Sequence, residues 1–302
     1  MKTLSEEINE VMNAKTSVAN KKVSLIKLGL SNADVNALFF NYNALARENN
    51  RLRRTQEQLL EGLTFGVEIE CVNAESELIH ERAAENNLSI NYERYNHTDN
   101  TRYYKFVSDA SLQGVNPIEC VSPVLCGKKG FNSLENCCKT LNEAGCSVNK
   151  STGLHVHIGG VTNPNQYINV FQNYKMLEDV IDTFMARSRR GDNSHWCKTL
   201  KDHDFSDCHT IHDVQDELRY DRYHRVNAEA YNRHQTIEFR QHAGTINYEK
   251  ISMWVKFCIR LVVWSADNVL TESINSINEI PFLTAKEKKF FTNRAEQLAS
   301  VA

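Results

Sequence analysis

The stretch TIEFRQHAGT, residues 236–245, is the most informative part of this chain, because it alternates ionisable and apolar side chains in the manner of a strand. Side chains on a strand point in turn to its two faces. We therefore expect Glu238, Arg240 and His242 on one face, and Ile237 and Phe239 on the other. The apolar face would pack in the core, which leaves the polar face for chemistry.

Three further stretches carry the same pattern. GVEIEC (66–71) presents Glu68 and Glu70, GLHVHIGG (153–160) presents His155 and His157, and an apolar run at 117–124 carries Glu119. With Glu238, these residues make four carboxylates and two imidazoles. They cannot share one sheet face without compensating positive charge, because desolvating carboxylates is costly. The set predicts divalent cations, and its carboxylate majority favours Mg²⁺ or Mn²⁺ over Zn²⁺.

Length and charge narrow the function classes. The chain has 302 residues and a formal net charge of -3, so it has no general attraction to nucleic acid or anionic membrane. It contains no apolar run of membrane-spanning length, and its polar start lacks the apolar core of a signal peptide. The nine cysteines are odd in number and form no CxxC pair, which predicts reduced, mostly buried thiols. We expect a soluble cytoplasmic protein that binds neither membrane nor nucleic acid.

The pattern of residue types divides the sequence into two regions. Residues 1–62 contain no proline and no strand-like run, and Ser31 is typical of the start of a helix. That helix would carry the apolar positions Leu38, Tyr42, Leu45, Leu52 and Leu59. The basic cluster Arg47, Arg51, Arg53 and Arg54 is interpreted as a solvated helix face.

From residue 63 onward, short strands at 65–72, 102–108 and 117–124 alternate with helices. Asn132 to Ala144 is expected to be helical, and Asn163 and Pro164 open a helix with an apolar stripe for the core. Another long helix is expected through 251–262. We predict a helical extension over 1–62 and a single catalytic domain over 63–302.

Together the motifs resemble those of the amidoligase family, which belongs with glutamine synthetase and glutamate-cysteine ligase among the carboxylate-amine ligases. The resemblance covers about residues 63–270, in the same order and spacing, and rests on FGVEIE (65–70), SDASL (108–112), IECVSP (118–123), GLHVH (153–157) and TIEFRQH (236–242). It implies an α+β fold with a curved, mainly antiparallel sheet flanked by helices. ATP and Mg²⁺ or Mn²⁺ ions would lie on the concave face, where ATP would activate a carboxylate for attack by an amine.

The resemblance also assigns roles by position. It implies that the metal ligands are Glu68, Glu70, Glu119, His157 and Glu238, and that Arg240 meets the phosphates or the acyl phosphate. His155 would be a ligand or would order His157, and His242 would be a base for the amine or a structural hydrogen-bond donor. Apart from the resemblance, the position of Arg222, Arg225 and Asn227 just before the 236–242 strand leads us to expect that they hold the nucleotide or a substrate carboxylate. Ala110 stands where the family often has glycine, which puts the tightness of that turn in question.

Other interpretations stay open. A zinc site is the rival for the stretch that contains His195, Cys197, His203, Cys208, His209 and His212, although its spacing fits no standard zinc pattern. A metal-dependent hydrolase and a non-catalytic protein of the same fold are the other candidates. The expected substrates are ATP, a carboxylate and an amine, with an amino acid or peptide among them. The N-terminal helices would serve a homo-oligomer or a protein partner.

Overall fold

The computed structural model describes residues 2–39, 62–94, 96, 98, 100–191 and 194–300. The chain separates into two compact units, Met1–Gln58 and Leu59–Ala302. In the described part of the chain, no helix is both long and apolar enough to span a membrane.

The smaller unit is helical. It contains α1 (Leu4–Asn13), α2 (Val18–Lys27) and a further helical segment over 32–39. Ser31 begins that segment as expected, because its hydroxyl accepts a hydrogen bond from the Asp34 amide at 3.2 Å. A small core of its own holds Met12, Leu25, Val35 and Phe39. The predicted positions Tyr42, Leu45, Leu52 and Leu59, and the arginines at 47, 51, 53 and 54, lie outside the described residues.

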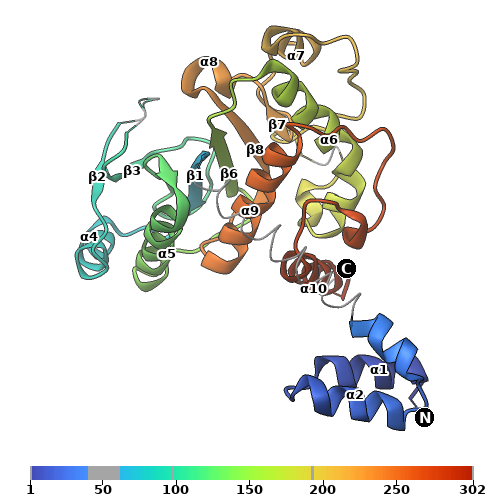
Figure 1. Ribbon diagram of the computed structural model, residues 1–302. Coiled ribbons are helices and arrows are strands. Elements are labelled where there is room, and N and C mark those ends of the chain that lie inside the picture. The colour runs from blue at the N-terminus through green and yellow to red at the C-terminus, as the bar shows by residue number, and fades with distance from the viewer. Residues whose placement is uncertain are drawn as a thin grey trace. The chain divides into compact units, whose positions relative to one another are not determined.

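The larger unit is built on one open, mostly antiparallel sheet with the strand order β2-β3-β4-β1-β6-β8-β7 (Figure 1). A short strand, β5, also pairs with β1. Among the named strands of the described residues, β2 and β3 form the parallel pair. A metal-dependent hydrolase built as a β/α barrel needs a closed barrel of parallel strands. The open, mostly antiparallel sheet of this unit is a different topology. The strands are β1 (Thr64–Cys71), β2 (Ile90–Tyr92), β3 (Tyr104–Val107), β4 (Ile118–Val121), β5 (Leu125–Cys126), β6 (Gly153–Gly159), β7 (Val226–Asn227) and β8 (Thr236–Ala243).

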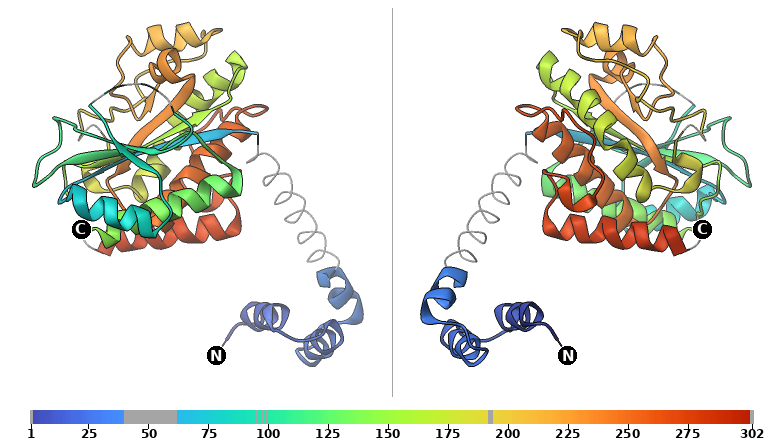
Figure 2. Two further views of the ribbon diagram at one scale, coloured as in Figure 1. Left: turned by 90° about the vertical axis from the view of Figure 1, so that its left-hand side faces the viewer. Right: turned by 90° about the vertical axis from the view of Figure 1, so that its right-hand side faces the viewer.

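Helices cover one face of this sheet. In both views of Figure 2, α4, α5 and α10 lie together on one side of it. The core forms between helices and the apolar side chains of the strands, such as Phe65 of β1 against Phe131 of α5, and Phe239 of β8 against Tyr174 of α6. The helices are α4 (Ser76–Glu85), α5 (Gly127–Glu143), α6 (Pro164–Thr183), α7 (Ile211–Glu217), α8 (Ala230–His234), α9 (Tyr248–Trp264) and α10 (Ala285–Ser300), with short 3-10 turns at Arg187–Arg189 and Ile277–Glu279.

The sequence pattern accounts for most of these elements. Asn163 caps α6 through a hydrogen bond from the Asn165 amide at 2.9 Å, and the predicted apolar stripe of α6 is buried. Helix α5 begins at Gly127, several residues before the predicted start at Asn132. All nine cysteines are free, and seven of them are buried, as their odd number and spacing predict.

Candidate active site

The predicted ionisable residues meet on the sheet face opposite the helices. Glu68 of β1 lies directly opposite His155 of β6, and Glu70 lies opposite Glu119 of β4. His157 in turn lies opposite Glu238 of β8. Residues directly opposite each other on paired strands project from the same face. Strand register therefore brings side chains that are 170 residues apart in sequence into one cavity of about 1380 Å³.

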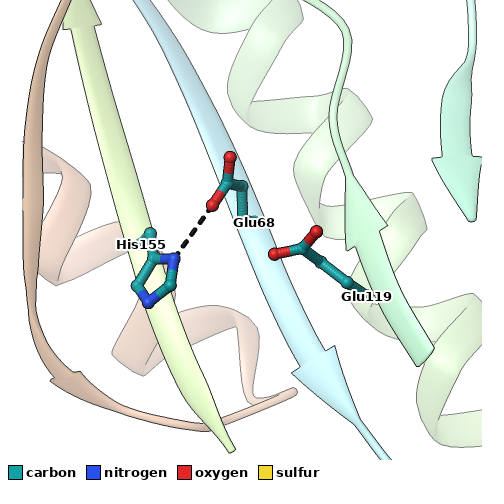
Figure 3. A group of neighbouring side chains, drawn as sticks. All are labelled: Glu68, Glu119 and His155. Carbon is teal, nitrogen blue, oxygen red and sulfur yellow. Dashed lines mark hydrogen bonds and ion pairs between the residues drawn. The ribbon is translucent and has the colours of Figure 1, made fainter. Parts of the chain in front are cut away.

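Glu68 lies at the centre of the cluster, between His155 and Glu119 (Figure 3). Its carboxylate is 2.9 Å from Nδ1 of His155 and 3.3 Å from Nε2 of His157. Burial acts to raise the pKa of Glu68, but the charge of His157 and the hydrogen bonds of both histidines outweigh it and hold the pKa well below its usual value. Glu68 is therefore ionised and bound on both sides by imidazoles.

The neighbouring half of the cluster contains carboxylates without such compensation. Glu70 accepts a hydrogen bond from the amide of Gly153, but no described residue donates one to the carboxylate of Glu119. Burial and the negative charges of Glu68, Glu70 and Asp109 raise the pKa of Glu119 well above its usual value. A divalent cation here would remove both the desolvation cost and the repulsion.

Arg240 supplies the fixed positive charge of the site. Its guanidinium is paired with Glu238, whose other carboxylate oxygen accepts a hydrogen bond from Asn227 of β7. Burial opposes ionisation of Glu238, yet the charge of Arg240 lowers its pKa. Glu238 is therefore compensated by Arg240, whereas Glu119 has no cationic partner among the described residues and still lacks positive charge.

The donor atoms fit metal ions. Three overlapping groups place one ligand atom from each member within 4.8 Å of the others. Oxygen donors predominate, as hard cations such as Mg²⁺ and Mn²⁺ prefer. The groups are Glu68 with Glu119 and His155, Glu68 with His157 and Glu238, and Glu70 with Asp109 and Glu119.

Two of the three residues expected to hold the nucleotide or substrate lie at the cavity. Arg222 and Asn227 line it, and the Arg222 guanidinium lies over the Tyr223 ring at 5.1 Å from the centroid. Arg225 does not line it, so that expectation is wrong. Its side chain is buried and forms ion pairs with Asp182 at 3.0 Å and Glu178 at 3.3 Å, both on α6. The sequence alone did not indicate these partners, which lie more than 40 residues away.

His242 points to the opposite face from the one predicted. Leu154 pairs with His242 and Val156 with Phe239, so β8 has one extra residue over this interval, which is a β-bulge. The bulge turns His242 towards the helices, where its ring lies 5.7 Å from Trp254 of α9. Its Nδ1 donates to the carbonyl of Ala243 at 2.7 Å, and burial lowers its pKa to about 3. His242 thus lies in the core and does not line the cavity.

The structure adds three residues to the site. Asp109 completes one ligand group, and its carboxylate accepts a hydrogen bond from the Ser111 amide at 2.7 Å in a turn that accommodates Ala110 without positive φ. Arg189 is buried, lines the cavity and donates to the carbonyl of Thr152 at 3.0 Å. Lys105 is buried in β3 and also lines the cavity. The SDASL motif signalled Asp109, whereas Lys105 and Arg189 had no motif.

The comparison with protein families agrees with this geometry. Residues 61–262 match the family described as "Putative amidoligase enzyme". The chain belongs to this amidoligase family. The match spans all eight strands and every predicted metal ligand of the amidoligase. No curated protein matches the chain.

Proposed function

We propose that this amidoligase is an ATP- and Mg²⁺-dependent carboxylate-amine ligase. In this reaction the substrate carboxylate attacks the γ-phosphate of ATP, which gives an acyl phosphate and ADP. An amine then attacks the acyl carbon, loses a proton, and expels phosphate to form an amide. The observation that carries the proposal is the gathering of four glutamates beside Arg240 on the cavity face of an amidoligase, with no cationic partner for Glu119 among the described residues.

The metal ions would be held by the acidic face of the sheet. The proposed ligands are the predicted set, with Asp109 and His155 beside them: Glu68, Glu70, Glu119, His157 and Glu238. Bound divalent ions would neutralise the phosphate oxygens during transfer, which is their general role in phosphoryl chemistry. The raised pKa of Glu119 supports this placement. Burial and the neighbouring carboxylates oppose its ionisation, and a nearby divalent cation would stabilise the ionised form.

The other polar residues have positioning roles in this account. Arg240 would direct one guanidinium edge to a phosphate or acyl phosphate while its other edge stays on Glu238. Asn227 orients Glu238, and His155 orients Glu68 at 2.9 Å. Arg222 is placed to bind nucleotide or a substrate carboxylate at the rim that it shares with Tyr223.

The cavity has room for more than the nucleotide. At about 1380 Å³ it exceeds the roughly 300–1,000 Å³ that is usual for a pocket holding one small molecule. We propose that the remaining space takes an amino acid or peptide as the carboxylate or amine substrate. Arg189, whose guanidinium lies beside Gly153 as the Glu70 carboxylate does, is suited to hold a carboxylate there.

A direct test is to incubate the purified protein with ATP, Mg²⁺ and a pool of amino acids and peptides. We expect phosphate release that depends on the pool, and a new mass equal to the sum of two substrates minus water. Glu68→Gln should abolish both signals, and Glu249→Gln, on the exposed part of α9, should retain them. ATP binding without turnover in any pool would favour the non-catalytic alternative. Amide cleavage in the absence of ATP would favour the hydrolase.

A further inference from the structure

A pair of histidines lies outside the cavity and outside the proposed chemistry. His203 and His224 point their Nε2 atoms at each other across 3.2 Å, with the ring planes at 82°. His203 belongs to the His- and Cys-containing stretch that suggested zinc, whereas His224 comes from the segment just before β7. Neither residue lines the cavity.

The hydrogen bonds on the far side of each ring fix where the protons lie. His203 Nδ1 faces Glu217 Oε1 at 3.2 Å, and His224 Nδ1 faces the Asp221 carbonyl at 3.0 Å. A carboxylate and a carbonyl only accept hydrogen bonds, so each Nδ1 must carry a proton. In the neutral state both Nε2 atoms then present lone pairs to each other. Such an arrangement needs a cation between them, either a proton or a metal ion.

The geometry matches two ligands of one metal ion. Zinc bound to imidazole nitrogens at the usual distance in a tetrahedral site places those nitrogens about 3.3 Å apart. Metal-binding histidines also commonly donate their other ring nitrogen to a carboxylate or a backbone carbonyl. Both histidines have such a partner, and Glu217 is itself held by the Asp204 amide at 3.0 Å.

A cation beside the pair in the chain fold is already compensated. Lys198, which is bridged to His224 through the main chain, forms an ion pair with Asp221 at 2.6 Å. Because both Nδ1 atoms are held by acceptors, the neutral imidazoles keep their Nε2 lone pairs for a metal ion, and the neutral form is the one that binds metals.

We propose that the Nε2 atoms of His203 and His224 bind one divalent transition metal ion of the zinc class, with water completing the coordination. The site is accessible, since the His203 side chain retains 17% of its exposure. It gives the zinc hypothesis a different form from the one that the sequence suggested. Of that stretch only His203 faces His224. In the described residues, neither this pair nor any other member of the stretch belongs to a group of three protein metal ligands, so the two histidines would be the protein ligands and water would supply the rest.

Metal binding here would stabilise one wall of the cavity. His224 follows Tyr223, whose ring lines the cavity beside Arg222. Binding would tie this segment to the loop that contains His203 and to the end of α7, where Glu217 lies. The expected consequence is a more stable protein, because a ligand that binds only the folded state shifts the unfolding equilibrium.

The test uses tag-free full-length protein titrated with ZnCl₂ alone, against the single variants His203→Gln and His224→Gln. We expect the wild type to bind one more zinc ion per chain than either variant, and to show a rise in melting temperature that both variants lack. His209→Gln, in the same stretch but outside the pair, should behave as the wild type. Equal zinc stoichiometry in the wild type and the two pair variants would overturn the proposal.

A second measurement needs no variant. Long-range proton–nitrogen spectra of the histidine rings in the wild type should show two Nε2 resonances shifting together on addition of one equivalent of zinc. Both Nδ1 atoms should remain protonated throughout. If zinc leaves these resonances unchanged, or if they report one proton shared between the rings at neutral pH, the metal site is refuted.

Discussion

The two faces of strand β8 show how one element serves both function and stability. Glu238 and Arg240 project into the cavity and carry opposite charges in contact. Phe239 and His242 project to the helices, where both are buried among aromatic rings. Substitutions on the cavity face should therefore change ligand binding, whereas substitutions on the helix face should change the stability of the fold.

The largest effect is expected from Phe239→Ala on the helix face. Phe239 is fully buried, and removal of a buried phenylalanine costs about 3 to 5 kcal/mol of unfolding free energy through lost burial and a cavity. Urea denaturation followed by circular dichroism would measure this change. If the unfolding free energy fell by less than about 1 kcal/mol, Phe239 would behave as an exposed residue does, and its proposed role in the core would be wrong.

A smaller, pH-dependent effect is expected from His242. Its pKa is near 3 in the folded protein and about 6.5 when unfolded, so the unfolded chain binds the extra proton between these values. Stability should therefore fall as the pH drops below 6.5, by about 2 kcal/mol at pH 5 from this residue. His242→Asn should reduce that slope of unfolding free energy against pH. An identical slope in both proteins would contradict the burial of a neutral imidazole.

On the cavity face, Glu119→Gln should hardly alter the stability of the metal-free protein. The raised pKa of Glu119 favours its neutral form, which glutamine resembles. Melting temperatures in EDTA should be similar for the wild type and the variant, whereas the rise caused by Mg²⁺ with ATP should be lost in the variant. If the variant responds to Mg²⁺ and ATP as the wild type does, Glu119 is not a metal ligand.

The smallest effect on the ligase unit is expected from removal of the N-terminal region. The helical unit has its own core of Met12, Leu25, Val35 and Phe39. A truncated chain that begins at Gly62 should keep the melting temperature and Mg²⁺–ATP binding of the full chain. It should lose self-association or a protein partner, which light scattering and pull-down experiments would detect. Global unfolding of the truncated chain would make residues 1–61 part of the catalytic core.

The sequence predicted the cavity face well where strand alternation is regular. The pattern in β1 and β6 placed Glu68, Glu70, His155 and His157 together, because period-two alternation survives in paired strands without interruption. It failed at the bulge in β8, because an extra residue leaves no mark in an alternating sequence and reversed the face of His242.

The sequence also did not predict the positions of side chains that are fixed by long-range packing. Arg225 has the appearance of a ligand-binding arginine beside the key strand, yet Glu178 and Asp182 of α6 hold it in the core. Arg189 shows the reverse case, because the turn after α6 directs it into the cavity. Such outcomes depend on how α6 packs against the sheet, which the local pattern around either arginine does not encode.

The central claim is that the acidic face binds ATP together with divalent ions, and calorimetric titration of ATP tests it most directly. We expect tight binding in the presence of Mg²⁺ or Mn²⁺, much weaker binding in EDTA, and loss of the metal-dependent part in Glu238→Gln. Glu249→Gln, which removes an exposed charge outside the cavity, should bind as the wild type does. Absence of ATP binding with either metal present, or an unchanged titration in Glu238→Gln, would contradict the account.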